Sequence, residues 1–128
     1  MRIAIVTPAD RTLRTGNRVT ALRWAQRLRE LGHGVRVATQ WSGENADALI
    51  AIHAVRSAES ALRWSERTPR APLIVVLSGT DVYDELGANA LQSLDAAHRI
   101  VALQPLACAR LDARQRAKCT PIVQSAPD

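Results

Sequence analysis

Six short apolar runs, rich in β-branched residues, alternate along this chain with longer segments that have helical spacing. Runs of this kind are typical of strands that are buried on both faces of a parallel sheet. The predicted strands are Ile3–Thr7, Val35–Thr39, Ala48–His53, Leu73–Leu77, Arg99–Leu103 and Pro121–Val123. The alternation predicts an α/β domain with a mainly parallel sheet of about six strands, helices on both faces and right-handed crossovers.

The segments between the strands predict four helices. The clearest is Asn17–Leu31, with Asn17 as its N-cap and Gly32 as its left-handed end. Its apolar residues recur at three-residue intervals: Leu22, Ala25, Leu28 and Leu31. The other predicted helices are Ser57–Arg67, Asn89–Ala97 and Leu106–Arg116. The second strand is expected to reach the third through a loop at Ser42–Ala46, without a clear helix.

Composition argues against several classes of function. The net charge of +5 comes mostly from dispersed arginines, and stacking aromatics are nearly absent, so we expect a small anionic ligand and no nucleic acid. Cys108 and Cys119, with ten residues between them, suit neither a disulfide framework nor a zinc site. We expect no metal and no cofactor. No apolar run is long enough to span a membrane and no signal-peptide cleavage site follows Met1, so we expect a cytoplasmic chain without a membrane partner.

Polar residues follow four of the predicted strands. In an open parallel α/β sheet, ligands bind beyond the carboxyl ends of the strands, so these residues should gather at one edge. They are Thr7 and the loop up to Asn17, then His53, Arg56 and Ser57, then Ser78–Asp81, then Gln104 and Pro105. The sequence therefore predicts a binding site at this edge.

Each of these residues also has a purely structural interpretation. Gly16 and Asn17 are either a turn and a cap, or the point where a helix N-terminus binds an anion, and they do not form a G-x-G-x-x-G motif. Arg18 is either a solvated charge or a phosphate donor. His53 is either a structural histidine or a site residue, and Asp81 either caps a turn or contacts substrate.

Five segments, in this order, resemble the N-terminal domain of GT-B glycosyltransferases: TGNRVTALRW, LIAIHAVRSA, LIVVLSGTDVYDEL, RIVALQPLA and IVQSAPD. Within that superfamily the chain is most similar to the selenosugar synthases of selenoneine biosynthesis, on GNRVTALRW, IHAVRSA and LSGTDVY. The resemblance spans essentially the whole chain. It implies a Rossmann-like three-layer sandwich, with residues 1–128 as the acceptor-side half of a GT-B enzyme. The end at Ser125–Asp128 resembles the hinge into a C-terminal nucleotide-sugar domain, which is absent from this chain.

The resemblance also implies a reaction. Selenophosphate would attack the anomeric carbon of a UDP-sugar, such as UDP-N-acetylglucosamine or UDP-glucose, and UDP would leave. Loss of phosphate would then yield a 1-seleno sugar. Because selenophosphate is already anionic, the protein's task would be positioning and charge neutralisation more than general-base catalysis. Without the second domain, we expect this fragment alone to be inactive.

The implied roles fall on the predicted edge. His53 and Asp81 are the candidate catalytic residues. The candidate substrate-binding residues are Gly16, Asn17 and Arg18 against phosphate or sugar oxygens, Arg56 and Ser57 on the acceptor side, Thr80 near sugar hydroxyls or the dephosphorylation water, and Gln104, Gln124 and Ser125 along the cleft and hinge.

Two other functions remain open from the sequence. A GT-B glycosyltransferase with a hydroxyl acceptor would need stronger activation of its nucleophile or charge stabilisation at its leaving group. A non-enzymatic module that binds a small ligand is the other alternative. A receiver domain is disfavoured, because the loop after the first strand holds Asp10 among Arg11 and Arg14 and has no acidic pair.

Overall fold

The fold is a single all-parallel sheet between layers of helices. The computed structural model describes residues 1–7, 16–54, 56–77, 88–103, 108–109 and 111–122, and only the backbone of residues 16 and 17. Every neighbouring pair of strands is parallel, in the order β2-β1-β3-β4-β5-β6. The strands are β1 (Arg2–Val6), β2 (Gly34–Ala38), β3 (Ala48–Ile52), β4 (Leu73–Leu77), β5 (Arg99–Ala102) and β6 (Cys119–Pro121). The expected fold class is confirmed, and the architecture is that of a Rossmann-like α/β domain.

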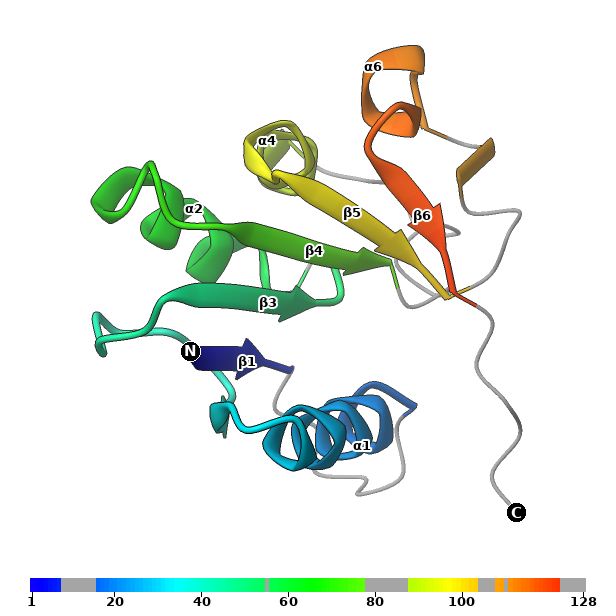
Figure 1. The fold of residues 1–128 in the computed structure, drawn as a ribbon. Helices are drawn as coiled ribbons and strands as arrows, with labels where there is room; N and C mark the ends of the chain where they lie inside the picture. Colours follow the sequence, from blue (N-terminus) through cyan, green and yellow to red (C-terminus); the bar gives the residue numbers. More distant parts are fainter. Residues whose placement is uncertain (8–15, 55, 78–87, 104–107, 110, 123–128) are drawn as a thin grey trace.

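Helices cover both faces of this sheet. They are α1 (Gly16–Glu30), α2 (Ala58–Arg67), α4 (Ala88–Ala96) and α6 (Ala113–Arg116). Figure 1 shows α1 on one face, and α2 and α4 together on the other. The chain moves from β1 to β2 in one direction and from β3 to β6 in the other, so right-handed crossovers place the helices of the two halves on opposite faces.

Helix α1 packs on the sheet through a different stripe from the one that the leucine spacing predicts. Ala21 and Ala25 are fully buried, whereas Leu22 and Leu31 are 48% and 74% exposed. Three residues turn an α-helix by only about 300°, so residues spaced strictly by three lie progressively farther around the helix from the core. The 3.6-residue period of the helix therefore determines which residues are buried. Asn17 lies inside the helix and not at its N-cap, because α1 already begins at Gly16.

The end of α1 agrees with the sequence. Gly32 has a φ of +94°, in the left-handed region that a C-terminal glycine adopts at low cost. The N–H of His33 then donates to the carbonyl oxygen of Leu28 at 3.0 Å, which satisfies one carbonyl of the last turn. The chain therefore leaves α1 in the direction that leads into β2.

The apolar core divides into two clusters, one on each face of the sheet. The cluster on the α1 face includes Ile5, Ile52 and Val76, and the cluster on the other face includes Trp64 of α2 and Leu94 of α4. Most buried core residues are alanine, valine, isoleucine or leucine, as the scarcity of aromatics predicts. Five consecutive residues of β3 are buried, as expected for a central strand that is covered on both faces.

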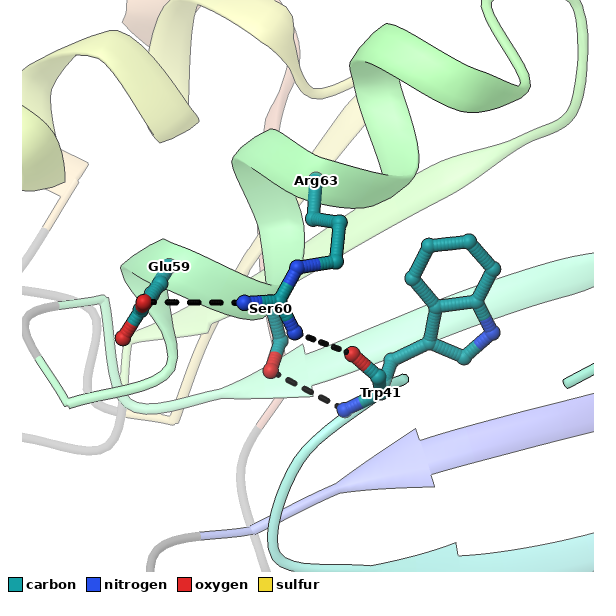
Figure 2. Close-up of polar contacts among 4 residues, drawn as sticks. All are labelled: Trp41, Glu59, Ser60 and Arg63. Carbon is teal, nitrogen blue, oxygen red and sulfur yellow. Dashed lines mark hydrogen bonds and ion pairs between the residues drawn. The ribbon is translucent and has the colours of Figure 1, made fainter. Parts of the chain in front are cut away.

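The connection from β2 to β3 has no helix, as the sequence predicts, and it is fixed to α2 by Trp41. Figure 2 shows these contacts. The backbone N–H of Trp41 donates to Ser60 Oγ at 3.0 Å, and the guanidinium of Arg63 donates to the Trp41 carbonyl oxygen at 2.8 Å. Arg63 also lies 3.6 Å from the carboxylate of Glu59. The indole of Trp41 packs edge-to-face on Trp64, with ring centroids 5.1 Å apart.

The predicted fourth helix, Leu106–Arg116, is wrong as one continuous element. Leu111 and Asp112 are not helical, and α6 begins after Asp112. The Asp112 carboxylate accepts a hydrogen bond from the N–H of Gln115 at 2.8 Å, and the Gln115 side chain accepts one from the N–H of Asp112. This capping box starts a new helix where the sequence period alone suggests continuation. Residues 104–107 and 110 lie outside the described part of the chain.

The bounds of every strand except β4 differ from the predictions by one or two residues, and two of these differences bear on the argument. β6 covers Cys119–Pro121 and so begins two residues before the predicted Pro121–Val123, because Cys119 aligns with Ile100 of β5 and the N–H of Ile100 bonds to the carbonyl of Lys118. Val123 itself lies outside the described residues. β3 ends at Ile52, one residue before the predicted end at His53. Both differences are small, but the second gives His53 a backbone conformation of its own.

We expect Trp64→Ala to lower the free energy of unfolding by about 3–5 kcal/mol, because the ring is fully buried between α2, the sheet and Trp41. Trp24→Ala is the matched control, since Trp24 is only partly buried on α1 and its loss should cost clearly less. Urea unfolding followed by circular dichroism measures both losses. Equal losses in the two variants would contradict this view of the core.

Candidate functional site at the carboxyl edge of the sheet

The order of the strands creates a switch point between β1 and β3. From β1 the chain runs outward to β2, and the later strands add on the other side of β1. Helices on the two sides therefore start from opposite faces, and the region beyond the carboxyl ends of two such strands is where open parallel sheets bind ligands. Val6 pairs with Ala51, so Thr7 and His53 follow neighbouring strand ends. In Figure 1 the start of α1 lies at the same edge as the arrowheads of these strands.

Thr7 follows the last residue of β1, and its side chain is buried. It is 1% exposed, and its Oγ1 has no hydrogen-bond partner among the residues that the structure describes. Its backbone N–H is satisfied, since it donates to the carbonyl oxygen of Ala38 at 2.9 Å. A buried hydroxyl without a hydrogen-bond partner lowers the stability of the fold by about 1–3 kcal/mol. Packing alone therefore does not explain a threonine at this position. The half-buried His33, at the opposite edge of the sheet, likewise has an atom, Nδ1, with no partner in the described part of the chain.

His53 is held in an unusual backbone conformation at the end of β3. Its φ is +79°, and among the described residues it is the only one besides glycine with a positive φ. This left-handed region is costly for a residue with a Cβ atom, and such residues concentrate at functional sites. The side chain is 5% exposed, and the backbone N–H of His53 donates to the carbonyl of Val76 at 2.9 Å. The turn is therefore joined to β4 as well as to β3.

A hydrogen bond from Arg56 indicates which tautomer the neutral ring of His53 adopts. The backbone N–H of Arg56 donates to Nδ1 of His53 at 3.1 Å. Nδ1 must therefore be unprotonated, and in the neutral ring the proton lies on Nε2. This arrangement makes His53 a hydrogen-bond donor at Nε2.

Ser57 fixes the turn that carries His53. Its hydroxyl donates to the carbonyl oxygen of Ile52 at 2.5 Å, and its backbone N–H donates to the carbonyl of His53 at 3.0 Å. Ser57 precedes α2 without capping it through its side chain, and it is buried. The hydroxyl proton is thus used within the protein, while contact of Ser57 with a substrate stays a prediction.

The remaining candidates divide into those that the structure describes and those that it does not. Gly16 begins α1, with Asn17 and Arg18 in its first turn, and Arg18 and Arg56 are exposed. No acidic residue stands in the first turn of α1. The candidates Thr80, Asp81, Gln104, Gln124 and Ser125 lie outside the described residues, and so their approach to this edge stays a prediction.

Sequence reasoning placed Thr7 at the edge but did not count it as a site residue. Threonine is common at strand ends, and nothing in the sequence shows that its hydroxyl lacks a partner. The left-handed backbone of His53 had no sequence signal either, because glycine is the residue that usually marks such a position. Both features become visible only when the neighbouring strands are in place.

A separate hollow of about 430 Å³ lies along β1 and β2, beside the β2–β3 connection. Its floor includes Ala4 and Ala38, and Arg36 and Glu44 border it. Hydrogen bonds to backbone N–H groups, first that of Ser42, lower the pKa of Glu44, and Arg36 lowers it further. None of the predicted site residues lines this hollow, and it is therefore distinct from the carboxyl edge.

The described residues give no sign of a metal site or a membrane span. They contain no group of three histidine, cysteine, aspartate or glutamate side chains that could hold a metal ion. Within the same part of the chain, no helix combines the length and the apolar character needed to cross a bilayer.

Comparison with known proteins adds no family assignment. No protein-family model and no curated protein matches the chain.

Thr7→Val tests whether the buried hydroxyl of Thr7 lowers the free energy of unfolding. We expect this change to raise the free energy of unfolding by about 1 kcal/mol, because it replaces an unpartnered buried hydroxyl with a methyl group of similar size. Ser57→Ala is the control and should lower it by about 1 kcal/mol, since that hydroxyl has a partner. Urea unfolding distinguishes the two. A loss of stability in Thr7→Val would show that Oγ1 is satisfied in solution.

His53→Asn and His53→Val test the strained turn. Asparagine tolerates a positive φ, whereas a β-branched residue does not, so we expect valine to cost about 1–3 kcal/mol more than asparagine. Thermal unfolding of the two variants gives the difference. If they unfold at the same temperature, the left-handed conformation of residue 53 is not maintained in solution.

Proposed function

We propose that this chain is the acceptor-side domain of a GT-B glycosyltransferase that joins selenophosphate to the sugar of a UDP-sugar and releases UDP. Two lines support the proposal. One is the resemblance of GNRVTALRW, IHAVRSA and LSGTDVY to selenosugar synthases. The other is the chemistry of the carboxyl edge, which suits an anion. The UDP-sugar would be held by a second, C-terminal domain.

The unpartnered hydroxyl of Thr7 is the observation that carries the proposal. Thr7 follows β1 at the switch point, and the chain returns to this edge to begin α1 at Gly16. The first N–H groups of a helix have no partners within the helix, and its dipole favours a negative charge at this end. The first turn carries no acidic side chain that would repel an anion bound at this end. A selenophosphate oxygen would accept from the Thr7 hydroxyl and from these N–H groups.

His53 would act as a hydrogen-bond donor to the substrate. Its Nδ1 accepts from the N–H of Arg56, so the neutral ring carries its proton on Nε2. A donor suits the oxygens of selenophosphate, and it would stabilise the charge on the departing phosphate. Arg18 and Arg56, both exposed, would add positive charge nearby.

The reaction divides into two displacements. The selenium of selenophosphate attacks the anomeric carbon, a selenium–carbon bond forms, and the bond from that carbon to the UDP oxygen breaks. Water then attacks phosphorus, the selenium–phosphorus bond breaks, and phosphate leaves from the 1-seleno sugar. Neither displacement requires the protein to remove a proton from selenium, so positioning and charge compensation would supply the catalysis.

A hydroxyl acceptor is the second candidate and fits the described residues less well. An alcohol is a weak nucleophile and profits from a general base within hydrogen-bond reach. Among the described residues of this edge, the one titratable imidazole already accepts a hydrogen bond at the nitrogen that would act as the base. A non-enzymatic binding module would share the anion site but would form no product.

Incubation of the full-length protein with a UDP-sugar and selenophosphate separates these functions. We expect a selenium-bearing sugar, identified by mass spectrometry through its isotope pattern, together with one UDP for each sugar formed. UDP release that depends on an added alcohol, and not on selenophosphate, would favour the hydroxyl acceptor. Ligand binding without UDP release would favour the binding module.

His53→Ala should lower the rate of selenosugar formation by about 10²-fold, because it removes a donor from the developing charge. Asp81→Ala is expected to lower the rate as well, with the fold intact. His98→Ala is the matched control, since Nδ1 of His98 accepts from the N–H of Leu73 at 3.1 Å, the same kind of contact at the opposite edge. Turnover at the wild-type rate in either edge variant would remove that residue from the active site.

A further inference from the structure

The sheet face opposite α1 is left partly uncovered at β1 and β2. The chain runs from β2 back past β1 to β3, so a right-handed crossover helix between these strands would lie on this face. The connection at residues 39–47 contains no helix. The helices of this face lie farther along the sheet, since α2 packs on β3 and β4 and α4 packs on β4. The hollow of about 430 Å³ lies here, lined by β1, β2 and this connection.

Alternate residues of β2 form part of the floor of this hollow. Val35 and Val37 pack with the cluster on the α1 face, so Gly34, Arg36 and Ala38 lie on the other face. A Cβ atom added to Gly34 would meet no atom within 4 Å, so the space above Gly34 is open. The small residues on either side of Arg36 therefore leave room for a ligand beside its side chain.

Two opposite charges, Arg36 and Glu44, border the hollow. Arg36 is exposed, and no hydrogen bond or ion pair joins its guanidinium to another of the described residues. The carboxylate of Glu44 accepts from the N–H of Ser42 at 2.9 Å, and the carbonyl oxygen of Glu44 accepts from Nε1 of Trp41 at 2.9 Å. These bonds hold Glu44 in place, while its carboxylate can accept further hydrogen bonds. The hollow therefore offers a positioned anion and a guanidinium that is open to a ligand.

Apolar residues form much of the remaining lining. Trp41 is 3% exposed, and Ala4 and Ala46 are half-buried against the core cluster of this face. Trp41 is fixed to α2, because its backbone N–H donates to Ser60 and its carbonyl oxygen accepts from Arg63 (Figure 2). The apolar part of the hollow is therefore formed before any ligand binds.

We propose that this hollow binds a small zwitterion with an apolar side chain, of the class of the apolar α-amino acids. The carboxylate of the ligand accepts a pair of hydrogen bonds from the guanidinium of Arg36. Its ammonium group donates to the carboxylate of Glu44, and its side chain lies on the apolar floor that includes Ala4 and Ala38. The volume of the hollow falls in the range of small-molecule sites, about 300–1,000 Å³.

Other occupants match this lining less well. An apolar helix or sheet from another chain would cover Arg36 and Glu44 without giving either a partner, and a buried charge without a partner is strongly unfavourable. Selenophosphate has no ammonium group for Glu44 and no apolar part for the floor. The proposal is independent of the glycosyltransferase function, because none of the candidate residues of the carboxyl edge lines the hollow.

Amide NMR of ¹⁵N-labelled protein tests the proposal with three ligands of similar size. They are L-phenylalanine, phenylpropanoate, which lacks the ammonium group, and phenylethylamine, which lacks the carboxylate. With L-phenylalanine we expect saturable shifts at Gly34, at Arg36 and at the indole N–H of Trp41, and we expect both analogues to bind more weakly. Equal affinity for the three ligands would overturn the proposal, and so would shifts confined to other parts of the chain.

Charge variants separate the two ends of the ligand. Arg36→Gln should weaken the binding of L-phenylalanine and of phenylpropanoate by about tenfold, because both carry the carboxylate. Glu44→Gln should weaken L-phenylalanine by about threefold and leave phenylpropanoate unchanged or tighter, since only the former carries an ammonium group. Arg99→Gln is the matched control, because Arg99 is an exposed strand residue that does not line the hollow. An equal loss for both ligands in Glu44→Gln would contradict the role of Glu44.

Gly34→Leu fills the hollow without straining the fold, because Gly34 does not have a positive φ and the space at its Cβ position is open. We expect this variant to keep the amide spectrum of a folded chain and to lose saturable binding of L-phenylalanine. Thr39→Leu adds the same side chain at an exposed residue that does not line the hollow, and it should bind like the wild type. Undiminished binding in Gly34→Leu would overturn the proposal. Shifts of the hollow's signals on dilution without ligand would overturn it too, since they would assign this face to a second copy of the chain.

Discussion

The parallel pairing of β1 with β2 on one side and β3 on the other is the constraint on which the rest of the structure depends. It fixes the direction of both neighbouring strands, so the polar residues that follow β1 and β3 must come out at the same edge. It also sends α1 to one face and the later helices to the other. Thr7 and His53, far apart in sequence, are neighbours at this edge for that reason alone.

A second constraint is the short connection between β2 and β3, which passes β1 without a helix. Trp41 supplies the packing that a helix would otherwise provide, because its backbone is bonded to Ser60 and Arg63 of α2 and its ring packs on Trp64. The open edge of the sheet at β2 is covered in part by a side chain of α1. At β2, the guanidinium of Arg29 donates to the outward carbonyl of Val35 at 2.9 Å, which reduces the capacity of that edge to pair with another strand.

Most of the fold could be predicted from the sequence, because buried parallel strands are short, continuous apolar runs. The observed bounds of β4, for example, are those predicted. Two local features could not be predicted from hydrophobic periodicity. The capping box at Asp112 interrupts an expected helix, and the leucine spacing of α1 points to the wrong buried face. At the candidate site, Thr7 and His53 follow neighbouring strands as the sequence predicts, while the approach of Thr80, Asp81 and Gln104 stays a prediction. The unpartnered hydroxyl of Thr7 and the left-handed backbone of His53 depend on neighbouring strands, so they required the structure.

The central claim is that an anion binds beyond the carboxyl ends of β1 and β3, at the start of α1. Amide NMR of ¹⁵N-labelled protein, titrated with selenophosphate, tests it most directly, because each backbone N–H reports its own surroundings. We expect the largest saturable shifts at Thr7, at the first turn of α1 and at His53. Shifts that concentrate at the opposite ends of the strands, for example at Leu73 and Arg99, or along the hollow of β1 and β2, would contradict the account.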